Sequence, residues 1–110
     1  MEVTEVPDYP ALTEQTYYIL LSLCKPRHGY GIMQQAEELS GGRVRLAAGT
    51  LYGALTSLCD KGWITLLPAD DGSRRKDYAL TEKGKGILIH EVKRLKELVR
   101  NGETILGEEL

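Results

Sequence analysis

Apolar residues recur along the chain with two different periods, and the change between them divides it into helices and strands. The first apolar run, from Tyr17 to Cys24, is so crowded that it predicts a helix buried on more than one face. Thr13 is a suitable N-cap for this helix. Lys25-Pro26 should end it, because the residue before a proline is pushed out of the helical region.

Two more helices are predicted before the period changes. The second begins around residues 29–31, places Ile32, Ala36 and Leu39 on one apolar stripe, and stops at the glycines of segment 40–42.

The third helix is predicted over residues 48–61, and Gly62 should end it. Leu51, Leu55 and Leu58 form its core stripe, which leaves its other faces free for contacts outside the domain.

A hairpin follows. Residues 63–67 are rich in strand formers and Pro68 closes the run, while residues 69–73 have turn chemistry and residues 77–80 form the return strand.

The last predicted helix starts after Thr81, a good N-cap, and extends to about Arg100, with Gly102 interrupting or ending it. Its apolar residues follow the 4-3-4 spacing of a coiled-coil seam: Leu88, Val92, Leu95 and Val99. Packing on the chain's own core would bury part of this face. A face this wide on so small a domain nevertheless predicts a two-fold homodimer held by these residues.

The net charge of −2 conceals a strong segregation of charge. Residues 1–14 hold four acids and residues 101–110 hold three, with no Lys or Arg in either segment. All fourteen cations therefore lie in residues 15–100 against nine acids, a local balance of +5. Local positive charge is what neutralises phosphate, so an acidic total does not exclude a nucleic-acid partner.

Other classes of function find little support. Cys24 and Cys59 lie in apolar stretches without metal-ligand or redox-motif spacing, so we expect both to be small core residues. The alternative, a redox-sensing pair, has no positive support in the sequence. His28 lies far from His90, and His90 with its neighbour Glu91 is expected on a solvated helix face. Without a glycine-rich phosphate loop, a metal cluster or a Ser/His/Asp set, we expect no enzyme, metal site or cofactor. No apolar run approaches the roughly 20 residues that span a bilayer, so a cytoplasmic protein is expected.

A helix followed by a hairpin that carries three consecutive cations is typical of a winged helix-turn-helix, which places one helix in the major groove and a loop on the neighbouring backbone. Those cations are Arg74, Arg75 and Lys76. The predicted fold is mainly helical (α+β), with three helices, a two-stranded wing and a long C-terminal helix. We expect a flexible arm at 1–10, a winged-helix domain at 11–81, and a dimerisation helix with an acidic tail at 82–110.

Several motifs in this layout match one family. Tyr30-Gly31-Ile32 opens the second helix and Gly49-Thr50-Leu51-Tyr52-Gly53-Ala54-Leu55 lies in the third. Gly62-Trp63-Ile64 precedes the cation triplet, and Leu80-Thr81-Glu82 begins a Leu-Thr-x-x-Gly pattern that ends at Gly84. In this order and spacing, over roughly residues 12–100, the chain resembles the PadR family of transcription regulators, in its compact subgroup with a single C-terminal helix. The resemblance implies a homodimeric winged-helix repressor. A two-fold dimer would match a palindromic operator in double-stranded DNA.

The outward positions of the third helix are the candidate DNA-reading residues, because small side chains permit close approach and hydroxyls can reach bases or phosphates. They are Gly49, Thr50, Tyr52, Gly53 and Ser57. Glycine in a helix costs about 1 kcal/mol relative to alanine, which favours a functional reason for it here. The alternative for Tyr52 is core packing against the first helix.

The three cations of the hairpin, and several residues outside the third helix, can be interpreted either as DNA contacts or as ordinary structural or surface residues. Arg74, Arg75 and Lys76 are predicted to contact phosphate or the minor groove, although nearby aspartates could pair with them on a surface that is charged for solubility. Tyr30 is either a phosphate ligand or a core residue. Arg43 and Arg45 fit a backbone contact or a solvated connector equally well, and Arg27 and His28 are weaker candidates.

Two alternatives to a DNA-binding regulator stay open: a winged-helix module for protein–protein interaction, and a small-ligand-binding protein that does not bind DNA. Many proteins of the resembled family respond to small hydrophobic or phenolic compounds, so the resemblance implies an apolar or phenolic effector at the dimer interface. Some compact members stack such ligands on an aromatic residue of the last helix. Residues 82–110 contain no Trp, Tyr or Phe, so stacking here would need Tyr9, Tyr17 or Tyr18.

Overall fold

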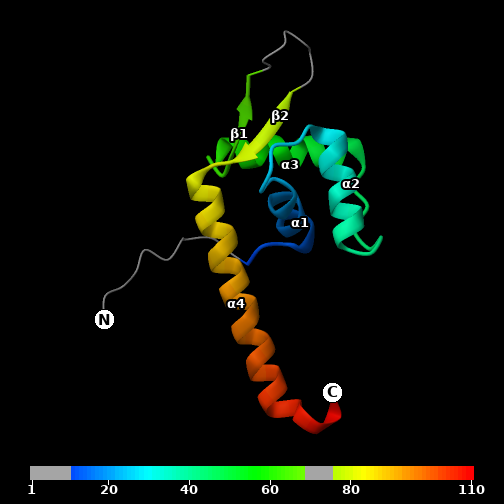
Figure 1. Ribbon diagram of the computed structural model, residues 1–110, viewed down its shortest axis with the longest axis vertical. Helices are drawn as coiled ribbons and strands as arrows, with labels where there is room; N and C mark the ends of the chain where they lie inside the picture. Colours follow the sequence, from blue (N-terminus) through cyan, green and yellow to red (C-terminus); the bar gives the residue numbers. More distant parts are fainter. Residues whose placement is uncertain (1–10, 69–75) are drawn as a thin grey trace, which may run out of the picture.

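The computed structural model describes residues 11–68 and 76–110 and confirms the mainly helical, winged helix-turn-helix architecture (Figure 1). The elements in chain order are α1 (Glu14–Ser22), α2 (Gly29–Leu39), α3 (Ala48–Asp60), β1 (Ile64–Leu67), β2 (Asp77–Leu80), α4 (Glu82–Leu106) and a short 3-10 turn, η1 (Gly107–Glu109). The three shorter helices and the hairpin form one body, and α4 extends away from it (Figure 1).

The predicted capping residues act as expected. The hydroxyl of Thr13 accepts a hydrogen bond from the Thr16 N–H at 3.1 Å, and the hydroxyl of Thr81 accepts one from the Gly84 N–H at 3.0 Å. Each bond satisfies one of the backbone donors that a helix start leaves unpaired. Gly62 follows α3 with a φ of 77°, a left-handed conformation that a residue with a side chain rarely adopts.

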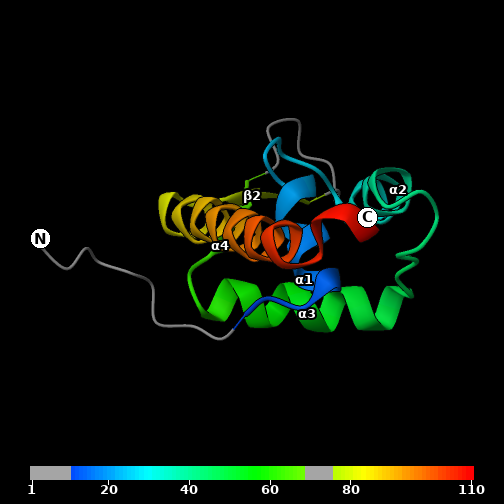
Figure 2. The same cartoon turned by 90° about the horizontal axis from the view of Figure 1, so that it is seen from below.

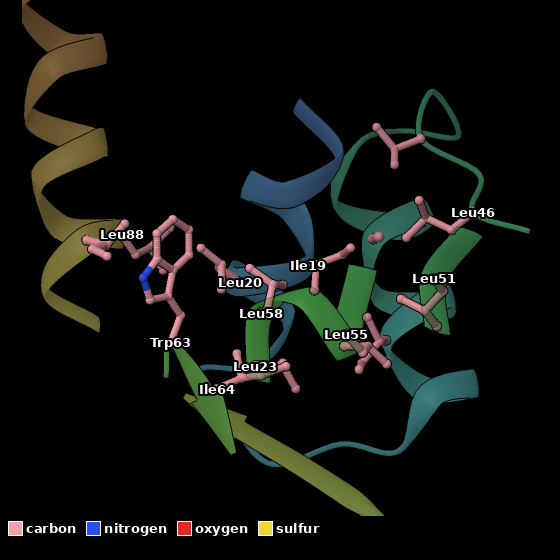
Figure 3. Close-up of a cluster of buried hydrophobic side chains, with 14 residues drawn as sticks. Ile19, Leu20, Leu23, Leu46, Leu51, Leu55, Leu58, Trp63, Ile64 and Leu88 are labelled. Atoms are coloured by element: carbon pink, nitrogen blue, oxygen red, sulfur yellow. The ribbon is translucent and has the colours of Figure 1, made fainter. Parts of the chain in front are cut away.

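One apolar core joins all four helices and the hairpin. Leu51, Leu55 and Leu58, the predicted core stripe of α3, are buried in it. Helix α1 supplies the centre, since it packs against both α2 and α4, and its Leu20 is fully buried. Figure 3 shows these side chains converging from α1, α3, β1 and α4.

The hairpin is antiparallel, with Ile64 opposite Leu80 and Leu67 opposite Asp77. Trp63, predicted inside the first strand, lies just before it. The loop between α1 and α2 adds a bridge to the far side of β2. The Arg27 N–H donates to the Tyr78 carbonyl at 3.1 Å, and the Tyr78 N–H donates to the Arg27 carbonyl at 2.8 Å. Such a lone bridge leaves no periodic signal in the sequence, and it was not predicted.

Three predictions about apolar positions were wrong. Helix α1 ends at Ser22 rather than Cys24, and Cys24 is exposed instead of buried in the core. The prediction for Cys59, by contrast, is confirmed, because this half-buried side chain packs against the core. Leu39 follows the spacing of Ile32 and Ala36, but it is 47% exposed, whereas both of those residues are buried. The spacing of apolar residues identifies a face, and it does not say how far along that face a neighbouring element extends.

Helix α4 is longer than predicted. It runs through Gly102, which was expected to interrupt or end it, and continues to Leu106. A single glycine costs about 1 kcal/mol in a helix interior, too little to break a helix of 25 residues with helical sequence on both sides. No helix in residues 11–68 and 76–110 is both long and apolar enough to cross a membrane.

Glu91 is a charged residue that is unexpectedly buried in the interior. It was expected on a solvated face, yet it is 1% exposed. Arg94 donates to its carboxylate from Nε at 2.8 Å and from a terminal nitrogen at 2.7 Å, and the Leu12 N–H donates at 3.2 Å. These bonds tie α4 to the chain just before α1. The hydrogen bonds from Arg94 lower the pKa of Glu91 despite its burial, and the Leu12 N–H adds to this effect.

Replacing Glu91 with glutamine should therefore destabilise the fold by about 2 kcal/mol at neutral pH, because charge-assisted hydrogen bonds to Arg94 are lost. A carboxyl group with a lowered folded-state pKa contributes stability above its ordinary value of 4.5 and loses it as pH falls through the folded value. The difference between wild type and Glu91→Gln should shrink below that pH. Urea unfolding at neutral and acidic pH measures it. A difference that does not change with pH would contradict the assignment.

Candidate nucleic-acid interface

Helix α3 presents a low, uncharged and exposed surface beside the wing (Figure 1). Its inner leucines are buried, whereas Gly49, Thr50, Gly53 and Ser57 are exposed. A side chain added at Gly49 or Gly53 would meet no described atom within 4 Å, so neither glycine is required by packing within the domain. Both therefore carry the cost of a helical glycine without an internal structural reason.

Thr50 and Tyr52 lie on opposite edges of this surface. Successive residues of a helix are turned by about 100° around its axis. Residues two positions apart are therefore turned by about 200°, which leaves the side chains of Thr50 and Tyr52 roughly 160° from each other. Gly49 and Gly53 lie between them. Ser57 is on the Thr50 side, where it borders a small hollow shared with α1 and Trp63. One groove edge can therefore meet Thr50 and Ser57 together, with Tyr52 on the other side of the helix.

Tyr52 is held by a close approach between α3 and α2. A Cβ at Gly29, the first residue of α2, would lie inside contact distance of the Tyr52 hydroxyl and ring. The ring thus rests against the start of α2, and Tyr52 remains 48% exposed. Its neighbour is α2 rather than α1, the helix named in the core-packing alternative.

Tyr30 is 61% exposed, which removes the interpretation that it is a core residue. The centroid of its ring lies 6.4 Å from that of His28, the residue before α2. Tyr30, His28 and the hydroxyl of Tyr52 are therefore all placed at the N-terminal end of α2, where backbone N–H groups favour an anion.

Of the three wing cations, only Lys76 lies within the described residues. Lys76 is exposed immediately before β2. Arg74 and Arg75 lie outside the described residues, so their predicted contacts keep the status of predictions. The register, with Leu67 opposite Asp77, places Lys76 at the outer end of the hairpin.

The connector between α2 and α3 alternates as its sequence pattern indicates. Val44 and Leu46 are buried, and Arg43 and Arg45 are exposed. Arg43 pairs with Glu14, while Arg45 lies 3.6 Å from a Glu37 carboxylate oxygen. Exposed ion pairs of this kind contribute little to stability, so both guanidinium groups can exchange their partners for phosphate at small cost.

The two cysteines give no support for a redox pair. Cys24 is exposed at the end of α1, and Cys59 is half-buried near the end of α3. Burial, with a smaller effect from the Asp60 carboxylate, raises the pKa of the Cys59 thiol. A raised pKa lowers the reactivity of a thiol at neutral pH. Among the described residues, no group of three or more His, Cys, Asp or Glu side chains could hold a metal ion.

A second surface lies on α4. Leu88 belongs to the chain's own core, so its burial needs no partner, whereas Val92 and Leu95 are half-buried and Val99 is 58% exposed. Beyond the predicted seam, Leu98, Ile105 and Leu106 are also exposed. The described part of the chain leaves the C-terminal half of this apolar face uncovered. Figure 1 shows this part of α4 extending beyond the three shorter helices, and Figure 2 shows the molecule from the C-terminal end of α4.

An open groove of about 450 Å³ runs between α1 and this part of α4. It is lined by Tyr17, Val92, Leu95, Lys96, Val99, Arg100 and Glu103. Burial raises the pKa of Tyr17, and the neighbouring Tyr18 and Glu91 raise it further. Tyr17 is one of the three tyrosines named as substitutes for an aromatic residue on the last helix.

The helices, the wing and the exposed face of α3 define a winged helix-turn-helix protein of the kind that regulates transcription. Comparison with known families is consistent with this, since the model of the transcriptional regulator PadR-like family matches residues 19–89. The chain belongs to this family.

Three similar proteins illustrate the relationship. Bacillus subtilis PadR, solved in complex with operator DNA, is 33% identical with a TM-score of 0.57, over 66% of this chain and 42% of that one. A PadR family transcriptional regulator from Eggerthella lenta is 26% identical with a TM-score of 0.63, over 84% and 80% of the two chains. A 37.1 kDa uncharacterized protein in transposon TN4556 of Streptomyces fradiae is 37% identical over 76 residues, and the match spans only 21% of its length.

The contact between Gly29 and Tyr52 can be tested by a double-mutant cycle. Gly29→Ala should destabilise the domain, because its methyl group would displace the Tyr52 ring, whereas in a Tyr52→Ala background the space is free and the cost should fall by about 1 kcal/mol. Gly31→Ala is the matched control, since its Cβ would meet its nearest atoms at an ordinary 3.5 Å. Equal costs of Gly29→Ala in both backgrounds would show that the two residues are not coupled.

Proposed function

We propose that the chain is a dimeric, sequence-specific DNA-binding transcription regulator that acts as a repressor. In this proposal the exposed face of α3 enters the major groove and the wing contacts the adjacent backbone. The observation that carries it is the open surface at Gly49 and Gly53, which allows the backbone of α3 to approach base edges closely. The similar Bacillus subtilis protein solved with operator DNA supports it.

The proposed roles along this surface differ. Thr50, with Ser57 on the same side, is proposed to read bases. The ring of Tyr52 rests on Gly29, so its hydroxyl is proposed to help Tyr30 bind a phosphate at the start of α2. Arg74, Arg75 and Lys76 are proposed to contact backbone or minor groove, and Arg43 and Arg45 flank the site with exchangeable ion pairs.

A dimer through α4 is proposed from its uncovered apolar face. The seam spacing continues past Val99 to Gly102 and Leu106 in a helix that does not end where the sequence indicated. A second copy related by a two-fold axis would cover this face and match a palindromic operator. Residues 1–10 would then serve as an arm and residues 11–81 as the DNA-binding domain. Residues 82–110 would form the dimerisation helix and an acidic tail.

An effector site is proposed in the groove between α1 and α4, which a partner subunit would help to enclose. Its apolar lining with Tyr17 at one wall fits a small apolar or phenolic compound, and Lys96 and Arg100 could neutralise an acidic group on it. Binding there would change the relation between the subunits and release the operator.

The DNA-reading proposal predicts two different responses to mutation. Thr50→Ala should cost about 1–3 kcal/mol on the selected operator and much less on scrambled DNA, because only a base contact carries sequence information. The double variant Arg74→Ala/Arg75→Ala should weaken binding to both duplexes and reduce the salt slope by about one unit per lost phosphate contact. Both are measured by equilibrium titration at several salt concentrations, and Tyr52→Phe is measured beside them.

Equal losses for Thr50→Ala on both duplexes would mean that this residue positions the helix without reading sequence. An unchanged salt slope in the double variant would assign its arginines to solubility. If the wild-type chain selects no sequence from a random DNA pool, the protein-interaction or ligand-binding alternatives take its place.

The dimer is tested at Val99, which is exposed in the single chain and can therefore be changed without disturbing the core. Val99→Glu should yield folded monomers, because a buried unpaired carboxylate at a helix interface costs several kcal/mol. Lys93→Glu is the control, an exposed change on the same helix away from the seam. Sedimentation and circular dichroism report assembly and helix content. A monomeric wild type at micromolar concentration would rule the dimer out.

A further inference from the structure

The first turn of α4 is joined to the end of α3 through the backbone of Gly62 and Trp63. The Thr81 N–H donates to the Trp63 carbonyl at 3.1 Å, and the Thr81 hydroxyl donates to the Gly62 carbonyl at 2.6 Å. The same hydroxyl caps α4 by accepting from the Gly84 N–H. The α3–α4 junction consists of Gly62, Trp63, Thr81 and Gly84.

Gly84 allows the two backbones to meet. A Cβ at this position would lie closer to the Trp63 carbonyl oxygen than the 3.0 Å below which real Cβ atoms essentially never approach another atom. It would also lie 2.9 Å from the carbonyl carbon and 3.2 Å from a methyl group of Leu80. A Cβ at Gly86, two residues further along α4, would meet no described atom within 4 Å. The requirement for glycine at position 84 is therefore a local contact.

Trp63 cannot easily move to make room. Its N–H donates to the Leu58 carbonyl at 3.1 Å, which fixes it to the last turn of α3. Its buried ring lies among the core residues near Leu88 (Figure 3), and Lys61 Nζ lies 4.9 Å from the ring centroid. A displacement at Gly84 can therefore be taken up by a change in the direction of α4 relative to α3.

We propose that the α3–α4 junction sets the distance between the two DNA half-sites that the dimer accepts, with Gly84 as the positioning residue. This rests on the proposed two-fold DNA-binding dimer. From Gly84 to Val99 the helix rises by about 22 Å. A tilt of about 10° at the junction therefore moves α3 by roughly 4 Å relative to the dimer seam, slightly more than the 3.4 Å rise of one base pair.

The test compares Gly84→Ala with Gly86→Ala, which also adds one methyl group to the first turns of α4. Each dimer is titrated with duplexes that carry two inverted copies of the half-site selected by the wild type, separated by spacers that cover roughly one helical turn of ten base pairs. Wild type and Gly86→Ala should share one preferred spacer. Gly84→Ala should lose about tenfold on that spacer, the effect of one mismatched base pair, and should shift its optimum or broaden its range. Its affinity for an isolated half-site should stay within about twofold, since α3 itself is intact.

A folded, dimeric Gly84→Ala that keeps the wild-type spacer preference would overturn the proposal, as would an equal loss on the isolated half-site. If Gly84→Ala does not fold, Thr81→Val takes its place in the same titration, because it removes the hydroxyl bond to Gly62 and keeps the side-chain shape. A wild-type preference in that variant would then overturn it. Failure of the proposed function is seen separately, in a wild type that is monomeric or selects no half-site.

Discussion

The close backbone contact at Trp63 is the constraint on which the other elements depend. Trp63 follows the glycine that ends α3 and precedes the first residue of β1. Its carbonyl accepts a hydrogen bond from the N–H of Thr81, the N-cap of α4. Its side chain is meanwhile part of the core. A single residue therefore relates α3, the wing and the long C-terminal helix to one another. The Glu91 carboxylate secures the other side of the same arrangement, because it binds α4 to the chain before α1.

Much of the fold was predictable from sequence, and each error has a physical cause. The leucine stripe of α3, the caps at Thr13 and Thr81 and the stop at Gly62 are local signals, and the structure confirms them. Burial of Glu91 could not be predicted in this way, since its partners include a backbone N–H 79 residues away. The Arg27 bridge is likewise a tertiary contact without a pattern of its own. Gly102 was given too much weight, because a glycine's cost is small against a long helix.

The candidate site shows the same division between local and tertiary information. Sequence spacing correctly assigns Gly49, Thr50 and Gly53 to the outer face of α3, because the inner face is marked by leucine. It could not show that Tyr52 rests on Gly29, a contact between two helices that depends on how closely they approach. The glycine at position 29 is the only hint that the sequence offers, and it becomes informative only once α2 and α3 are placed. The sequence assigns Thr50 and Tyr52 to the same outward face of α3, whereas the structure places them in two different environments.

In the proposed dimer, the exposed half of α4 would connect DNA recognition with effector binding. An isolated domain would gain nothing by extending an apolar helix past its core, yet Leu98, Val99, Ile105 and Leu106 all lie open in the single chain. The groove beside them begins at Tyr17 on α1, and α1 is itself bound through Leu12 to the buried Glu91 of α4. A molecule that entered the groove would press on two helices whose relative position is otherwise held by that carboxylate and by the Trp63 contact. Because α3 is attached to the same framework, its position relative to the partner subunit of the proposed dimer would change without any direct contact between the bound molecule and the exposed face of α3.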